Sequence, residues 1–168
     1  MDNRSYILNI VREHMDNLLD DWLPFRSMPI NIKFFSGSKR ARAYVATSKV
    51  KDNSGFFKPN NDELDLMLSE DVFLNKNANV DELIMTITHE VFHIIQRNVY
   101  SDDELRDKRS NISFVKNNIS INSKNRLELE AEVFTINIHG RSYNSLKGAK
   151  DNELYKQILS NIINMDFV

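Results

Sequence analysis

The sequence contains no cysteine and no long hydrophobic run. The lack of cysteine excludes a disulfide scaffold, a zinc finger with thiolate ligands and a cysteine nucleophile. A metal site in this chain would therefore have to be built from His, Asp and Glu. No stretch approaches the ~18 apolar residues of a membrane span, and charged residues interrupt the apolar positions near the N-terminus. We therefore expect no membrane partner and no signal peptide, and predict a soluble, cytoplasmic protein.

An excess of charge of one sign is also lacking. The chain has 22 Lys and Arg against 24 Asp and Glu, which gives a formal charge of −2. Proteins that bind nucleic acid non-specifically are usually basic, so we do not expect a nucleic-acid partner. The length of 168 residues and a hydrophobic content of 41% predict one domain over residues 1–168. The abundance of Asn, Lys and Ile favours an AT-rich genome, such as that of a phage or of a low-GC bacterium, and a phage product would act in the host cytoplasm.

Apolar and polar residues alternate in the segments that we expect to form strands. One strand is predicted over residues 29–35, and another begins at Glu63 and ends at Ser69. Residues 41–47 are expected to pair back on the first strand as a hairpin. The sequence thus predicts a small, three-stranded, mostly antiparallel sheet, with residues 51–61 as a loop.

Helical spacing of apolar residues predicts four helices, over residues 6–23, 80–97, 126–139 and 151–165. Asn79 is a suitable N-cap for the second helix, and Gly140 is a suitable residue to close the third. Residues 101–125 are polar and are expected to form a long loop, which could line a cleft or act as a lid. Together with the sheet, these helices give an α+β fold.

The second helix contains the string His89-Glu90-Val91-Phe92-His93, an HExxH motif. Two His side chains at positions i and i+4 of a helix point the same way, so they can bind one metal ion. The Glu between them is close enough to accept a proton from a water on that metal. A helical wheel places these residues on a narrow polar stripe of an otherwise apolar helix. The alternative, a surface helix with two incidental His, should instead show a wide polar face rich in Lys and Glu.

A catalytic zinc ion usually has three protein ligands, so a third residue is needed. The third helix offers Glu128, Glu130 and Glu132. On the wheel, Glu128 and Glu132 share one polar stripe and Glu130 lies on the opposite one. We expect Glu128 to be the third ligand and Glu132 to hydrogen-bond a ligating His. Glu130 remains the alternative third ligand.

An HExxH motif followed on a later helix by a Glu resembles the zincin metallopeptidases of the gluzincin type. The spacing Glu128-x-x-Ala131-Glu132 is similar to a Glu-x-x-Ala-Asn/Asp signature of small bacterial and phage-encoded peptidases. The order of the elements also resembles that of SprT-like minimal zincins, although those typically use a third His. The resemblance implies a minimal zincin-like domain: an N-terminal helix, a small sheet, the HExxH helix, the third-ligand helix and a C-terminal helix.

The same resemblance implies a zinc-dependent metallopeptidase with one Zn²⁺ per chain, bound by His89, His93 and Glu128. Glu90 would be the general base that activates the attacking water. His139 or Tyr143 would supply a further donor to the developing oxyanion.

Zincins present an edge strand to their substrate, so a protein or peptide substrate is expected along the strand from Glu63 to Ser69. Two alternatives stay open at this stage. The chain could be a catalytically silent metal-binding regulator, or a DNA-associated protein of the SprT-like kind.

Overall fold

The computed structural model describes residues 3–24, 26, 28–37, 42–51, 53–75, 78–109, 126–140 and 153–165. The chain forms two compact units, Met1–Glu90 and Val91–Val168, and the boundary between them falls inside the long helix α3. Over the described ranges the structure has six helices and one three-stranded mixed sheet. This confirms the α+β class. The zincin-like fold and the single domain stay predictions.

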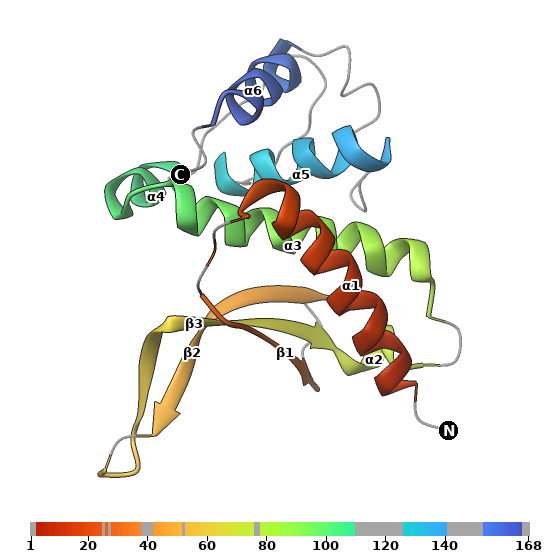
Figure 1. The fold of residues 1–168 in the computed structure, drawn as a ribbon, viewed down its shortest axis with the longest axis vertical. Helices are drawn as coiled ribbons and strands as arrows, with labels where there is room; N and C mark the ends of the chain where they lie inside the picture. Colours follow the sequence, from red (N-terminus) through yellow and green to blue (C-terminus); the bar gives the residue numbers. More distant parts are fainter. Residues whose placement is uncertain are drawn as a thin grey trace. The chain divides into compact units, whose positions relative to one another are not determined.

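The sheet belongs to the unit Met1–Glu90 and has the strand order β1-β3-β2 (Figure 1). Its strands are β1 (Ile30–Phe35), β2 (Ala43–Lys51) and β3 (Phe57–Ser69). β1 pairs with β3 in parallel, from Ile30 opposite Leu64 to Phe35 opposite Ser69. β2 pairs with β3 in the antiparallel direction. β3 is therefore the central strand.

This topology corrects three expectations about the sheet. β2 forms its hairpin with β3 and not with β1, so the sheet is mixed rather than mostly antiparallel. The expected loop over residues 51–61 shrinks to a tight turn, in which Gly55 has a φ of +83°. The segment from Glu63 to Ser69 is not an edge strand. Its residues Leu64, Leu66 and Leu68 are fully or almost fully buried, which suits a strand with neighbours on both sides.

The predicted N-terminal helix is confirmed as α1 (Arg4–Trp22). Its buried side chains recur at helical spacing: Ile7, Val11, Met15, Leu18 and Leu19. The Thr88 hydroxyl donates its hydrogen to Ile84 O, so Thr88 Oγ1 can only accept from His14. His14 Nε2 therefore donates to Thr88 Oγ1 over 2.8 Å. His14 therefore has a structural role. A four-residue helix that the sequence did not indicate, α2 (Glu70–Phe73), directly follows β3.

The HExxH motif lies on α3 (Val80–Val99), two residues longer than predicted. Asn79 Oδ1 accepts hydrogen bonds from the backbone N of Asp81 (2.9 Å) and Glu82 (3.4 Å), which confirms the N-cap. Most of the helix is buried, and a row of half-buried polar residues four apart runs along it: His89, His93 and Arg97. The narrow polar stripe of the helical wheel is thus confirmed.

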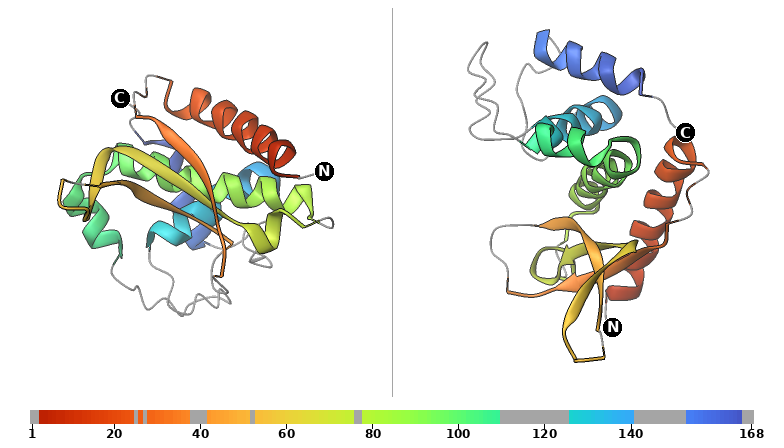
Figure 2. Two further views of the ribbon diagram at one scale, coloured as in Figure 1. Left: turned by 90° about the horizontal axis from the view of Figure 1, so that it is seen from below. Right: turned by 90° about the vertical axis from the view of Figure 1, so that its left-hand side faces the viewer.

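The unit Val91–Val168 contains the end of α3 together with α4 (Asp102–Arg109), α5 (Arg126–His139) and α6 (Glu153–Ile163), seen in Figure 2. α5 has the bounds predicted for it, and Gly140 closes it with a φ of +76° and an N–H donated to Ile136 O. α6 is shorter than predicted. α4 corrects the expected loop over 101–125, of which residues 110–125 lie outside the described ranges.

Both apolar arcs of α5 are buried, as expected for a helix packed on two sides. The ring of Phe134 stacks on Phe92 of α3 with 4.6 Å between centroids, which joins the two helices that carry the candidate ligands. Within the described part of the chain, no helix combines the length and apolar character needed to cross a bilayer.

Candidate metal centre

The HExxH residues gather at one point of α3. One potential ligand atom from each of His89, Glu90 and His93 lies within 4.8 Å of the other two. Both His are half-buried, whereas Glu90 is only 7% exposed. The helix alone produces this cluster, because residues at i and i+4 lie one above the other on one face. The grouping that the sequence predicts is present.

The ring of His93 is held at both of its nitrogen atoms. Nδ1 lies 2.7 Å from Oε1 of Gln96, one turn further along α3. Nε2 lies 2.9 Å from Oε1 of Glu128, in the first turn of α5. The contact joins the motif to the helix that was expected to supply the third ligand.

The contact between His93 and Glu128 is partly open to solvent. The side chain of His93 is 16% exposed and that of Glu128 is 40% exposed. Nε2 of His93 and Oε1 of Glu128 are both atom types that bind divalent cations, so one cation could be bound by both side chains.

Glu130, the alternative third ligand, lies in a different setting. The residue is 1% exposed, and its carboxylate accepts hydrogen bonds from three side chains. The Tyr100 hydroxyl lies 2.8 and 2.9 Å from the two oxygens, Lys108 Nζ lies 3.0 Å from Oε1, and Gln96 Nε2 lies 3.2 Å from Oε2. Both oxygens of Glu130 are therefore already in use.

Two pKa shifts accompany these buried contacts. Burial, and then the charge and hydrogen bond of Glu130, raise the pKa of the Tyr100 phenol well above its ordinary value of 10.0. Tyr100 therefore stays protonated and always donates to Glu130. Burial and the neighbouring charge of Arg109 lower the pKa of Arg97. A guanidinium remains charged at neutral pH even so.

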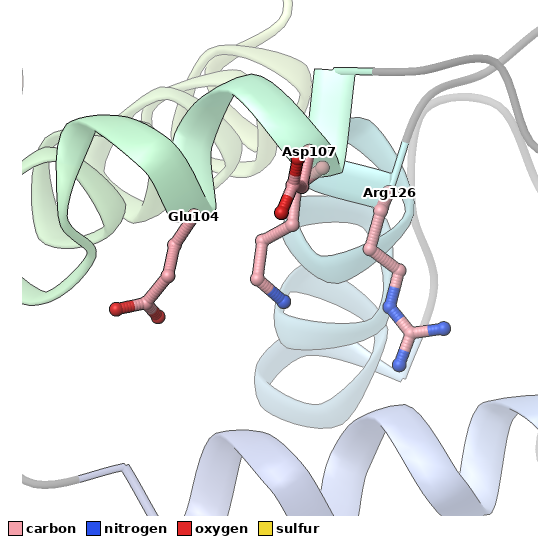
Figure 3. A pocket seen from close by; sticks show the side chains of 4 residues that line it. Glu104, Asp107 and Arg126 are labelled. Carbon is pink, nitrogen blue, oxygen red and sulfur yellow. The ribbon is translucent and has the colours of Figure 1, made fainter.

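A hollow of about 350 Å³ lies next to side chains that contact the buried carboxylate of Glu130. It is lined by Glu104, Asp107 and Lys108 of α4 and by Arg126 of α5 (Figure 3). Lys108 contacts Glu130, and Arg126 Nε lies 4.0 Å from it, so the hollow borders the solvent side of the Glu130 contacts. The described residues of its lining are two acids and two bases, a balance that favours no one ligand charge.

The remaining predicted site residues have different outcomes. Glu132 is 2% exposed and lies one turn after Glu128 on α5, and its expected hydrogen bond to a ligating His stays a prediction. His139 ends the same helix, eleven residues after Glu128. At ~1.5 Å per residue that is roughly 16 Å along the axis, too far for a donor to an oxyanion beside Glu128. Tyr143 lies outside the described residues.

Sequence reasoning assigned no role to Gln96, Tyr100 or Lys108. Only Gln96 carried a signal, because it falls on the polar stripe three residues after His93. Tyr100 and Lys108 follow the helix in a polar segment with no periodicity that would connect them to Glu130. Their part in the structure depends on the packing of α4 against α5.

Comparison with protein-family models, with curated protein sequences and with solved structures finds no match to this chain. The function is therefore inferred from the residues of the candidate site and from their geometry.

Proposed function

We propose that this protein is a zinc-dependent metallopeptidase, which hydrolyses peptide bonds with Glu90 as the general base. The observation that carries the proposal is the contact of His93 Nε2 with Glu128 Oε1 at 2.9 Å. It brings a carboxylate from a second helix to the HExxH cluster, and two His with one Glu form a familiar catalytic zinc site.

The donor set fits a zinc ion in type and in spacing. Zinc binds His nitrogen and carboxylate oxygen at ~2.0–2.2 Å, so two ligand atoms of a tetrahedral site lie roughly 3.4 Å apart. The 2.9 Å between His93 and Glu128 is close to this value, and His89 belongs to the same HExxH cluster as His93.

The same geometry favours Glu128 over Glu130 as the third ligand. Glu128 contacts the ligating His and is 40% exposed, so a metal can reach it. Glu130 would first have to give up hydrogen bonds from Tyr100, Lys108 and Gln96. Breaking charge-assisted hydrogen bonds at a buried carboxylate costs several kcal/mol.

A zinc ion held by His89, His93 and Glu128 would supply Lewis-acid chemistry, which polarises a carbonyl and lowers the pKa of a water molecule. Glu90 would accept the proton that the attacking water loses as its oxygen bonds to the carbonyl carbon. Glu90 then gives the proton to the leaving amine as the C–N bond breaks. At 7% exposure Glu90 is shielded from bulk water, which strengthens its interactions with a developing charge.

The position of β3 changes how a peptide could bind. Both sides of the strand are already paired over Leu64–Leu68, so it cannot accept an added substrate strand. The expected binding of substrate along the segment from Glu63 to Ser69 is therefore not part of the proposal. Within the described ranges β1 and β2 are the outer strands of the sheet, so an added substrate strand would have to pair with one of them.

The test measures the zinc content of the purified protein and its hydrolysis of a quenched fluorescent peptide library. We expect about one zinc per chain and hydrolysis that a chelator abolishes. Glu90→Gln should keep the zinc and lose at least ~100-fold in rate, because only the base is removed. Glu128→Gln should lose both, whereas Glu13→Gln, at an exposed position of α1, should match the wild type.

Each other result has a definite meaning. A wild type that takes up no zinc when the ion is supplied would overturn the proposal. Stoichiometric zinc with no hydrolysis of any peptide would instead support the metal-binding protein without protease activity. Zinc lost in Glu130→Gln but retained in Glu128→Gln would make Glu130 the third ligand.

A further inference from the structure

We infer that Gln96 is a positioning residue, which is itself anchored by Glu130 and which directs Nε2 of His93 towards the metal. The inference rests on the proposed function, since it assigns how one ligand of the same site is held. Gln96, His93, Glu130 and their contacts all lie in the unit Val91–Val168, on α3, α4 or α5 or immediately after α3.

The first step is the orientation of the Gln96 amide. Its Nε2 lies 3.0 Å from Leu127 O and 3.2 Å from Glu130 Oε2, and both of these atoms can only accept. A flipped amide would place its oxygen against two acceptors in a site where Gln96 is 1% exposed. The two acceptors therefore fix the nitrogen on their side, and the oxygen must face His93.

The second step is the protonation of the imidazole. An amide oxygen accepts hydrogen bonds and cannot donate, so Nδ1 of His93 must carry the proton in its 2.7 Å contact with Gln96 Oε1. Nε2 is then the nitrogen whose lone pair is available to a metal, and it is the one that faces Glu128. The hydrogen bond thus selects both the tautomer and the direction of the ring.

The third step is the rigidity of the anchor. Glu130 is held from the far side by the Tyr100 hydroxyl and by Lys108 Nζ, and the ammonium also lies 4.5 Å from the centre of the Tyr100 ring. The carboxylate therefore cannot swing away and release the amide. Gln96 has three side-chain torsions, and an unanchored amide would sample several directions. With the anchor, His93 is oriented before any metal arrives.

The expected consequence is a loss of zinc affinity when the amide is removed. Partners that hydrogen-bond a ligating His typically contribute ~10- to 100-fold in metal affinity. Gln96→Met keeps the length of the side chain and removes both the acceptor for Nδ1 and the donor to Glu130. Gln157→Met makes the same substitution at an exposed position of α6 and is the matched control.

Two measurements test the inference. Zinc affinity is measured by competition with a chromophoric chelator for the wild type, Gln96→Met and Gln157→Met. The nitrogen chemical shifts of the His rings are measured by NMR in the zinc-free wild type, with His93 assigned from a His93→Gln variant. We expect a ~10- to 100-fold weaker affinity for Gln96→Met alone, and a proton on Nδ1 of His93 in the wild type.

The outcomes separate this inference from the proposed function. A wild type that binds no zinc overturns the function, and the NMR result still decides how His93 is held. Zinc binding that Gln96→Met leaves unchanged overturns the positioning role of Gln96. A bare Nδ1 on His93 in the wild type overturns it as well, even if Gln96→Met does not fold.

Discussion

Two carboxylates that lie two residues apart on α5 differ sharply in their exposure to solvent and in their hydrogen-bond partners. The side chain of Glu128 is 40% exposed and contacts the imidazole of His93. The side chain of Glu130 is 2% exposed and accepts hydrogen bonds from a phenol, an ammonium and an amide. A helix turns ~100° per residue, so the two side chains leave it in nearly opposite directions.

The difference shows which carboxylate can exchange its partner. Glu130 has donors on both of its oxygens and almost no contact with water, so its contribution is to the folded structure. Glu128 faces a single ring nitrogen at a site that solvent reaches, so a cation could be bound by both side chains. Stability should therefore respond most to substitution of Glu130 and metal binding most to substitution of Glu128, although Glu130 also anchors Gln96.

The largest expected effect is that of Glu130→Ala on stability. Removal of this carboxylate leaves the Lys108 ammonium and the donors of Tyr100 and Gln96 without their acceptor. Loss of one partner from a buried ion pair costs ~3–5 kcal/mol, and the partial exposure of Lys108 favours the lower end. Urea denaturation of the zinc-free protein measures this. Glu13→Ala should stay within ~0.5 kcal/mol of wild type, and an equally small loss in Glu130→Ala would contradict the contrast.

Tyr100→Phe should have the second largest effect. It removes one hydroxyl that donates to the buried carboxylate and keeps the ring beneath Lys108. A hydrogen bond to a charged group contributes ~1.5–3 kcal/mol, and Tyr100 is half-buried, so we expect a loss of about 1.5 kcal/mol. The same denaturation experiment gives the value, with Tyr6→Phe at an exposed position of α1 as its control. A neutral result would mean that Lys108 and Gln96 alone satisfy Glu130.

The pH dependence of stability should give a second measure of the buried contact between Tyr100 and Glu130. Burial and Glu130 raise the pKa of Tyr100 above 10.0, so above pH 10 the folded chain binds more protons than the unfolded chain. Unfolding then releases a proton, and stability falls as the pH rises, by up to ~1.4 kcal/mol per pH unit for one group. Burial also raises the pKa of Tyr155, which adds to the slope in both proteins. Stability of Tyr100→Phe should therefore fall less steeply between pH 10 and 11, and equal slopes would contradict the prediction.

The helices of this fold were predictable because the sequence features that define a helix lie within the helix itself or directly beside it. Apolar spacing, the N-cap at Asn79 and the closing Gly140 located α3 and α5 to within two residues. The sheet was not predictable in the same way, because alternation identifies a strand but not its neighbours. The sequence put residues 41–47 against the first strand, whereas the tight turn at Gly55 pairs β2 with β3. Strand pairing depends on contacts between distant residues, which one sequence does not reveal.

In the candidate site, too, the features within one helix were predictable and the contacts between distant residues were not. His89, Glu90 and His93 follow from the geometry of one helix, and the wheel of α5 separates Glu128 from Glu130. The residues around Glu130 did not follow, because Tyr100 and Lys108 come from outside the two helices considered. His139 was expected as a further donor to the oxyanion without regard to its distance along the helix from Glu128. Eleven residues of rise separate His139 from Glu128.

The smallest expected effect on stability is that of Glu128→Gln in the zinc-free protein. Its contact with His93 is partly exposed, and ion pairs of that kind contribute ~0–1 kcal/mol, so we expect a change below about 0.5 kcal/mol. Denaturation in the presence of a chelator measures it. With zinc at a thousand times its dissociation constant, the wild type should gain about 4 kcal/mol and Glu128→Gln far less. A large loss without zinc would instead show that Glu128, like Glu130, is needed for folding, and the contrast between the two carboxylates would fail.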